Sequence, residues 1–288
     1  MLNPAPYNSV AVASTFSPRF IQVLAEAKRI GRNFGADLSL IYVGEKSEET
    51  AARFRAAFEQ LSLPLATGVH YEQGDPADAI LRALSENSIE LIVAGALEEQ
   101  VVLHPFLGNV ARRLVREANC SVMLFTQPEA EPKPLRKIVF VADHSPRALE
   151  ALKKTIWLAA AEASERLHVI RVITAFEQAR AKAAGKPDKL KTADAEEAAL
   201  EEFVLSAGST EVPIETRCVR GNTGFVAADF VRAIGADLLV VPVAPSSGGE
   251  LPNNIAWLTE VIPCNLWLVR SAESQRDVPT TVDLALEL

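Results

Sequence analysis

Short apolar runs alternate with segments of helical periodicity along most of the chain. The runs of the first half cover 9–13, 38–43, 68–72, 90–96 and 121–125. Those of the second half cover 137–142, 167–173, 214–220, 237–243 and 265–269. Between the first two runs, apolar residues follow the spacing of one helix face at Phe20, Val23, Leu24, Ala27 and Ile30. Further helices are predicted near 48–62, 76–86 and 109–118, so strands and helices alternate.

The strand runs have the composition of a parallel sheet. The run Leu-Leu-Val-Val at 238–241 is apolar at successive positions, which indicates burial on both faces under covering helices. Right-handed crossovers then predict an α/β protein with two tandem doubly wound five-stranded parallel-sheet domains, each with strand order 3-2-1-4-5.

The two halves are copies of one unit. Ser17-Pro18-Arg19 and Ser145-Pro146-Arg147 each follow the first apolar run of their half. Both serines are expected to be helix N-caps, because their hydroxyls can accept hydrogen bonds from unpaired amides, with proline as the first helical residue. The second copy carries an insertion near 177–209.

The segment between the copies is rich in proline and poor in apolar residues, which is typical of an extended linker. We therefore expect a first domain at 1–127, a linker at 128–136, a second domain at 137–270 and a tail at 271–288. The apolar fifth strands, 122–125 and 266–269, are expected to pair into an intramolecular pseudo-dimer, because edge strands need cover. Two chains associating into a homodimer is a further expectation.

Composition and charge narrow the classes of protein. Of the 288 residues, 49% are apolar and 23% are charged, as in an ordinary soluble protein. The net charge of −8 repels phosphate backbones, so nucleic acid is not expected as a partner. No apolar run reaches the roughly 18 residues of a membrane span, and the first ten residues do not resemble a signal peptide. We expect a cytoplasmic protein that does not bind membranes.

Cysteine and histidine indicate neither metal binding nor catalysis. Three scattered cysteines make no disulfide framework, which fits a reducing compartment. The four histidines stand at no metal-ligand spacing, so no metal site is expected. Asp143, His144 and Ser145 are neighbours in sequence, so their side chains point apart and cannot form a catalytic relay.

The sheet topology predicts where a ligand would bind. Ligands of doubly wound sheets lie at the carboxyl ends of the strands where the strand order reverses. In each half this crevice falls between the first and fourth strands. Ser14, Thr15 and residues 95–109 would line it in the first half, and Asp143 and residues 242–254 in the second.

Motifs at this crevice carry a family resemblance. VADHS at 141–145 ends the first strand of the second half in Asp before Ser, and Val43 and Val172 end the second strands. Gly95 and Gly108 stand at the separation of the outer glycines in a loop of Gly, two residues, Gly, nine residues and Gly-Ser or Gly-Thr. With these features the chain resembles a tandem universal stress protein. The resemblance covers nearly the full chain except the linker, the insertion and the tail. In nucleotide-binding members this loop holds phosphates with glycine amides and a helix N-terminus.

The first half departs from the nucleotide-binding pattern. Thr15 stands where the family has Asp, Glu98 replaces the middle glycine and Asn109 replaces the hydroxyl residue. A carboxylate about 4 Å from a phosphate charge costs roughly 1 kcal/mol in water and about 4 kcal/mol at an effective dielectric of 20. Arg112 and Arg113 could compensate if they faced the phosphates.

The second half departs in the opposite way. Asp143 is present and could accept a hydrogen bond from a ribose hydroxyl, but Pro242 takes the first glycine position. Ser246 to Gly249 could form an anion nest or a plain surface turn. The resemblance therefore implies candidate ligand-contacting residues without a complete nucleotide set in either half. They are Thr15, Val43, Gly95, Glu98, Gly108, Asn109, Val110, Asp143, Val172, Ser246 and Gly248.

The resemblance implies a stress-response binding or regulatory protein with degenerate nucleotide sites, and not a dedicated catalyst. No cofactor is required by the residues, and ATP is the one that the family suggests. Two alternatives stay open: an ATP-binding protein with slow hydrolysis, and a binder of an apolar small ligand in the same crevice.

Overall fold

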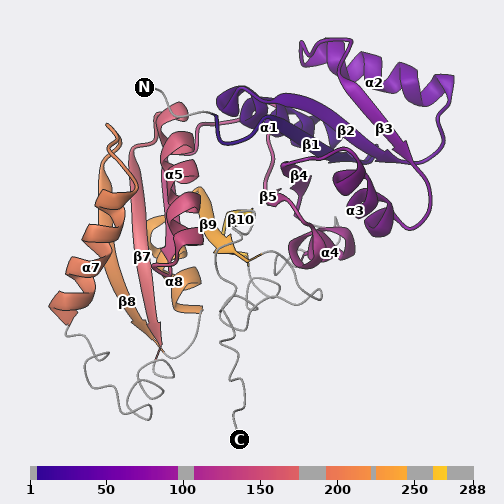
Figure 1. Ribbon diagram of the computed structural model, residues 1–288. Helices are drawn as coiled ribbons and strands as arrows, with labels where there is room; N and C mark the ends of the chain where they lie inside the picture. The colour runs from indigo at the N-terminus through magenta and orange to yellow at the C-terminus, as the bar shows by residue number, and fades with distance from the viewer. Residues whose placement is uncertain (1–4, 97–106, 175–192, 222–224, 245–261, 271–288) are drawn as a thin grey trace, which may run out of the picture.

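The first half of the protein folds as the predicted alternation of strands and helices (Figure 1). The computed structural model describes residues 5–96, 107–174, 193–221, 225–244 and 262–270. The elements of the first half are β1 (Ser9–Ser14), α1 (Phe20–Phe34), β2 (Asp37–Val43), α2 (Glu48–Gln60), β3 (Gly68–Glu72), α3 (Pro76–Glu86), β4 (Leu91–Gly95), α4 (Asn109–Glu117) and β5 (Ser121–Phe125). Their strands are parallel, in the order β3-β2-β1-β4-β5.

The second half repeats this arrangement. Its elements are β6 (Lys137–Ala142), α5 (Pro146–Ala161), β7 (Arg166–Thr174), α7 (Ala193–Ser206), β8 (Ile214–Gly221), α8 (Phe225–Ile234), β9 (Leu238–Val243) and β10 (Asn265–Arg270). Its strands are parallel as well, in the order β10-β9-β6-β7-β8. Each half thus has the predicted order 3-2-1-4-5, with α7 lying in the predicted insertion.

The halves join through their fifth strands, as the sequence predicts. β5 and β10 pair antiparallel, with Met123 opposite Trp267, and the described strands form one ten-stranded sheet. Both strands lie between the two halves in Figure 1. Met123 and Trp267 are fully buried, so the pairing covers two apolar edges that would otherwise face water.

Helices cover both faces of this sheet. Side chains of α1, α2, α5 and α7 pack into one apolar core, and those of α3, α4 and α8 into another on the opposite face. Both cores contain residues of both halves. β1 and β4 are neighbours in the sheet, but the chain continues from β1 to β2 on one side and from β4 to β5 on the other. The strand order therefore reverses between β1 and β4, which is where ligands of such sheets bind.

The predicted N-cap is correct in the second half and wrong in the first. The Ser145 hydroxyl accepts a hydrogen bond from the Ala148 amide, and Pro146 is the first residue of α5. In the first half the helix begins later, at Phe20, because the Ser17 carbonyl accepts the Phe20 amide in a preceding turn. Phe16 packs against Phe20 and Phe54 there, with ring centroids 5.4 and 4.7 Å away.

Candidate ligand site

A cavity of about 600 Å³ opens where the strand order of the first half reverses. We call it the crevice cavity. It lies at the carboxyl ends of β1 and β4, between the start of α1 and the start of α4. The residues that line it include Ser14, Thr15, Arg19, Phe20, Val23, Val43, Ile80, Gly95, Gly108, Asn109, Val110, Ala111, Phe125 and Pro128.

Most of the first-half candidates from the sequence meet in this cavity. They come from four separated segments, which end β1, β2 and β4 and begin α4: Thr15, Val43, Gly95, Gly108, Asn109 and Val110. Glu98, the remaining first-half candidate, lies outside the described residues. The convergence follows from topology, because the carboxyl ends of neighbouring parallel strands meet at one edge of the sheet.

The start of α4 forms one side of the crevice cavity. Gly108 is the N-cap of this helix and makes no side-chain cap hydrogen bond. Its amide donates to the Ala96 carbonyl at 3.1 Å, which fixes the helix start against the end of β4. The first amides of a helix have no acceptor within the helix, and they carry partial positive charge. Asn109, Val110 and Ala111 line the cavity, so this side favours an acceptor or an anion.

Ser14 adds a buried hydroxyl to the cavity lining. It is only 3% exposed, and its Oγ has no hydrogen-bond partner among the described residues. A buried polar group without a partner costs about 1–3 kcal/mol. A ligand or water in the cavity that donates to or accepts from Ser14 would offset this cost.

Sequence reasoning missed part of the lining. Arg19, Phe20 and Val23 of the α1 region line the cavity, as does Pro128 from the predicted linker. Arg19 belongs to the repeated Ser-Pro-Arg tripeptide, so the repeat was a usable signal. Pro128 gave none, because a proline-rich composition does not reveal what the segment touches.

Positive charge near the cavity is scarce. Arg19 is the one charged residue among the described residues that line it. Arg113 is engaged elsewhere: it contacts Asp78 at 2.6 Å, Glu117 at 2.7 Å and Asp75 at 3.3 Å. Hydrogen bonds from Arg113 hold the pKa of Glu117 below its ordinary value. Arg112 donates to the Leu107 carbonyl at 3.3 Å. Neither Arg112 nor Arg113 is among the described residues that line the cavity, so the compensation they could have supplied is not seen there.

In the second half, the carboxylate of the candidate residue Asp143 is hydrogen-bonded to residues that follow it closely in sequence. Asp143 accepts hydrogen bonds from the amide and hydroxyl of Ser145 and from Arg147, at 3.0 Å for the amide and 3.1 Å for Arg147. The expectation that the side chains of Asp143 and Ser145 point apart is therefore wrong, because the turn before α5 brings the Ser145 hydroxyl onto the carboxylate. Burial acts to raise the pKa of Asp143, but these hydrogen bonds outweigh it and the pKa lies below its ordinary value. Asp143 is thus a satisfied turn carboxylate, with less capacity left for a ribose hydroxyl.

Of the other second-half candidates, the structure describes only Val172. Val172 is half-buried in β7, while Ser246 and Gly248 lie outside the described residues. His144, which departs from the family pattern, has a left-handed φ of 56°. Its ring packs edge-on against Phe203 of α7, with centroids 5.2 Å apart. The insertion therefore contributes a contact to the loop that follows β6.

The described residues hold neither an evident metal site nor a reactive thiol. No group of three His, Cys, Asp or Glu side chains among them could bind a metal ion. Burial raises the pKa of Cys120 to about 11 and that of Cys264 to about 12, and it also raises the pKa of Cys218, so all three thiols stay protonated near neutral pH. Within the described helices, none has the length and apolar character needed to cross a membrane.

Comparison with known proteins agrees with this fold. The family model described as universal stress protein family matches residues 45–126 and 134–270, so the chain belongs to that family. Because the family unit occurs twice, it is a tandem member. A universal stress protein of Methanocaldococcus jannaschii is 23% identical over 145 residues, covering 43% of this chain and 85% of the relative.

Solved structures share the whole two-half architecture. A universal stress protein of Archaeoglobus fulgidus superposes with a TM-score of 0.65 at 13% identity, covering 92% of this chain and 98% of the other. A Pseudomonas aeruginosa PAO1 protein of unknown function also gives 0.65, at 16% identity and 92% coverage of both chains. At these identities the likeness concerns the fold alone.

Proposed function

We propose that this chain is a non-catalytic binding and regulatory protein of the stress response, and that the crevice cavity of the first half is its ligand site. The ligand is a small molecule with an apolar ring and little negative charge, such as an adenine nucleotide with a single phosphate. Among the described residues of the second half, the candidate carboxylate Asp143 is already engaged by Ser145 and Arg147, so we place the ligand in the first half.

The composition of the crevice cavity is the observation that carries this proposal. Apolar side chains such as Val23, Val43 and Phe125 form much of the lining, which suits a flat ring. The start of α4 and Arg19 supply a place for a small anionic group. Ser14 supplies a buried hydroxyl that lacks a partner among the described residues.

The same composition argues against a triphosphate and against catalysis. A triphosphate brings several negative charges, whereas Arg19 is the one cation among the described residues of the lining. Glu98 takes the place of a loop glycine in the nucleotide-binding pattern, so its negative charge would oppose phosphates held by that loop. No carboxylate, histidine or cysteine is found among the described lining residues, so they offer no general base for hydrolysis.

Two other kinds of ligand for the crevice cavity can be told apart by experiment. Gly95, Gly108 and the start of α4 favour ATP binding with slow hydrolysis, as in the loop of the nucleotide-binding pattern. The apolar side chains of the lining favour an uncharged ligand. Native mass spectrometry of freshly purified protein would reveal a retained apolar ligand by its added mass.

Calorimetric titration with AMP, ATP with Mg²⁺, and adenosine tests the proposal. A matched pair of variants locates the site: Val110→Trp fills the cavity from α4, and Asn119→Trp adds the same bulk at an exposed position just beyond that helix. We expect AMP to bind, ATP to bind no tighter, no phosphate release, and loss of binding in Val110→Trp alone. Tighter ATP binding with phosphate release would establish the alternative, and no binding of any of the three would reject the proposal.

A further inference from the structure

One segment of chain separates the crevice cavity from a second cavity. Phe125 and Pro128 line the crevice cavity, whereas Thr126, Gln127 and Glu129 line a cavity of about 400 Å³ at the junction of the two halves. We call residues 125–129 the wall segment and the second space the junction cavity. Because successive residues face different spaces, a shift of the wall segment changes both.

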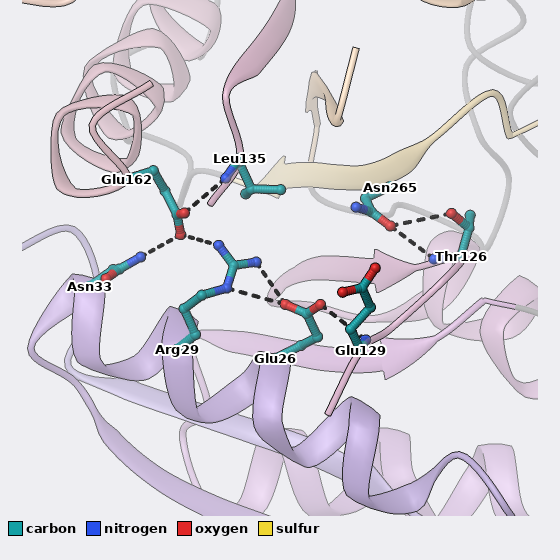
Figure 2. A network of polar contacts seen from close by, with 8 residues as sticks. All are labelled: Glu26, Arg29, Asn33, Thr126, Glu129, Leu135, Glu162 and Asn265. Atoms are coloured by element: carbon teal, nitrogen blue, oxygen red, sulfur yellow. Dashed lines mark hydrogen bonds and ion pairs between the residues drawn. The ribbon is translucent and has the colours of Figure 1, made fainter. Parts of the chain in front are cut away.

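The second half holds this wall segment through Asn265, the first residue of β10. The Asn265 Oδ1 accepts hydrogen bonds from the Thr126 amide at 3.0 Å and from the Thr126 hydroxyl at 3.3 Å (Figure 2). Phe125 is fixed by a different bond, from the Ala96 amide to its carbonyl at 2.9 Å. Further along the segment, the Glu129 amide makes a long contact of 3.5 Å to the Glu26 carboxylate.

The duplication supplies a matched contact at the other end of the β5–β10 pair. There the Ser121 hydroxyl, from the first residue of β5, accepts a hydrogen bond from the Arg270 amide at 3.0 Å. The same position in the two copies thus carries different acceptors, Ser121 and Asn265. A serine can therefore do in this geometry what Asn265 does.

Two other sides of the crevice cavity are also tied to the second half. The helix α1, which lines the cavity with Phe20 and Val23, bonds further along to Glu162 through Arg29 and Asn33 (Figure 2). The buried Arg270 guanidinium donates to the Val115 carbonyl near the end of α4 at 2.6 Å and to the Cys120 carbonyl just before β5 at 3.2 Å. Both helices are therefore fixed by groups that belong to the other copy.

We infer that the second half positions the ligand cavity of the first, and that Asn265 is the positioning residue for the wall segment. This inference rests on the proposed function. A preordered wall spares a ligand the cost of ordering it, so losing the anchor weakens binding. Coupling is reciprocal, so a ligand in the crevice cavity must also strengthen the Thr126–Asn265 contact.

A serine–alanine pair at position 265 tests the inference in the full chain. Asn265→Ser keeps an acceptor for Thr126, as Ser121 does for Arg270. Asn265→Ala removes the acceptor, and alanine differs from serine only by the missing hydroxyl. By calorimetry we expect AMP affinity to fall by ~3- to 10-fold in Asn265→Ala, the worth of one ordinary hydrogen bond. Asn265→Ser should stay within about twofold of the parent protein. Equal affinity in parent and Asn265→Ala would overturn the inference and leave the proposed function standing.

A second measurement takes its main result from the unaltered protein, so that result does not depend on a variant folding. Amide hydrogen exchange at Thr126 should slow when AMP saturates the protein, and the slowing should persist in Asn265→Ser and vanish in Asn265→Ala. Unchanged exchange at Thr126 in AMP-saturated parent protein would reject the inference. If AMP does not bind the parent protein at all, the proposed function fails first and the inference fails with it.

Discussion

The guanidinium of Arg29 in α1 and the carboxylate of Glu162, just after α5, form a buried ion pair between residues 133 positions apart. Their side chains are 9% and 2% exposed. Glu162 also accepts the Leu135 amide at 2.9 Å, and Arg29 also donates to Glu26 at 2.7 Å (Figure 2). One cation thus lies between two buried carboxylates at the meeting point of the halves and the linker.

Removing Glu162 should destabilise the protein strongly. Glu162→Ala leaves the Leu135 amide and part of the Arg29 guanidinium without their acceptor, and both residues are buried. Breaking a buried pair in this way costs about 3–5 kcal/mol, and the remaining contact to Glu26 places our expectation near 3 kcal/mol. Urea unfolding at neutral pH measures the free energy of unfolding.

A nearby exposed pair provides the control. Glu165 contacts Arg136 at 2.5 Å, but the two side chains are 51% and 60% exposed. Water solvates both groups after substitution, so Glu165→Ala should change stability by less than about 1 kcal/mol. Equal losses in the two alanine variants would show that the buried pair has no special role in holding the halves together.

Neutralising Glu26 should stabilise the protein at neutral pH. Burial raises the pKa of Glu26 above its ordinary value of 4.5, despite the neighbouring Arg29. The folded state therefore binds this proton more tightly than the unfolded state, and stability falls as pH rises through the raised pKa. Glu26→Gln keeps an acceptor for Arg29 and leaves one carboxylate per guanidinium, so a gain of roughly 1 kcal/mol is expected at pH 7.

Urea unfolding from pH 4.5 to 8 tests this sign. The parent protein should lose stability relative to Glu26→Gln as the pH increases, and the two curves should converge toward acid pH. A Glu26→Gln variant that is less stable than the parent at pH 7 would mean that the second carboxylate stabilises the network as an ion.

Ser14 should show opposite effects on stability and on binding. Its Oγ is buried without a partner among the described residues, so Ser14→Ala should leave the ligand-free protein equally stable or up to about 1 kcal/mol more stable. The same variant should bind AMP ~3- to 10-fold more weakly, because the ligand loses one hydrogen bond. Thermal unfolding with and without AMP measures both. Unchanged AMP affinity would mean that Ser14 does not touch the ligand.

Glu98 should oppose phosphate binding. Glu98→Gly restores the middle glycine of the loop pattern and removes a negative charge. Removing about 1 kcal/mol of repulsion should strengthen binding of ATP with Mg²⁺ by roughly fivefold in calorimetry, with a smaller gain for AMP. If neither affinity changes, the carboxylate is not the obstacle to a triphosphate.

Most of the fold could be predicted from the sequence, because strands buried on both faces of a parallel sheet are apolar at successive positions. The run at 238–241 lies in β9, and the order 3-2-1-4-5 holds in both halves. The start of α1 could not be predicted, because Ser17 has the right chemistry for an N-cap at the wrong place. Packing of Phe16 into its aromatic neighbours accompanies a turn there that sequence periodicity does not reveal.

The candidate site was predictable where backbone topology decides it, as for Thr15, Gly95 and Asn109. The contacts between side chains of the two halves could not be predicted. Arg29 and Glu162 both look like solvent-facing helix charges in sequence, yet they are buried against each other. Asp143 matches the family pattern, but its own neighbours Ser145 and Arg147 occupy its carboxylate.

A crystal structure of the protein with AMP tests the central claim most directly. We predict ligand density in the crevice cavity of the first half, with the phosphate at the start of α4 and a hydrogen bond to Ser14, and none beside Asp143. Nucleotide density in the second half with an empty crevice cavity, or a triphosphate with Mg²⁺ fully bound in the first half, would contradict this account.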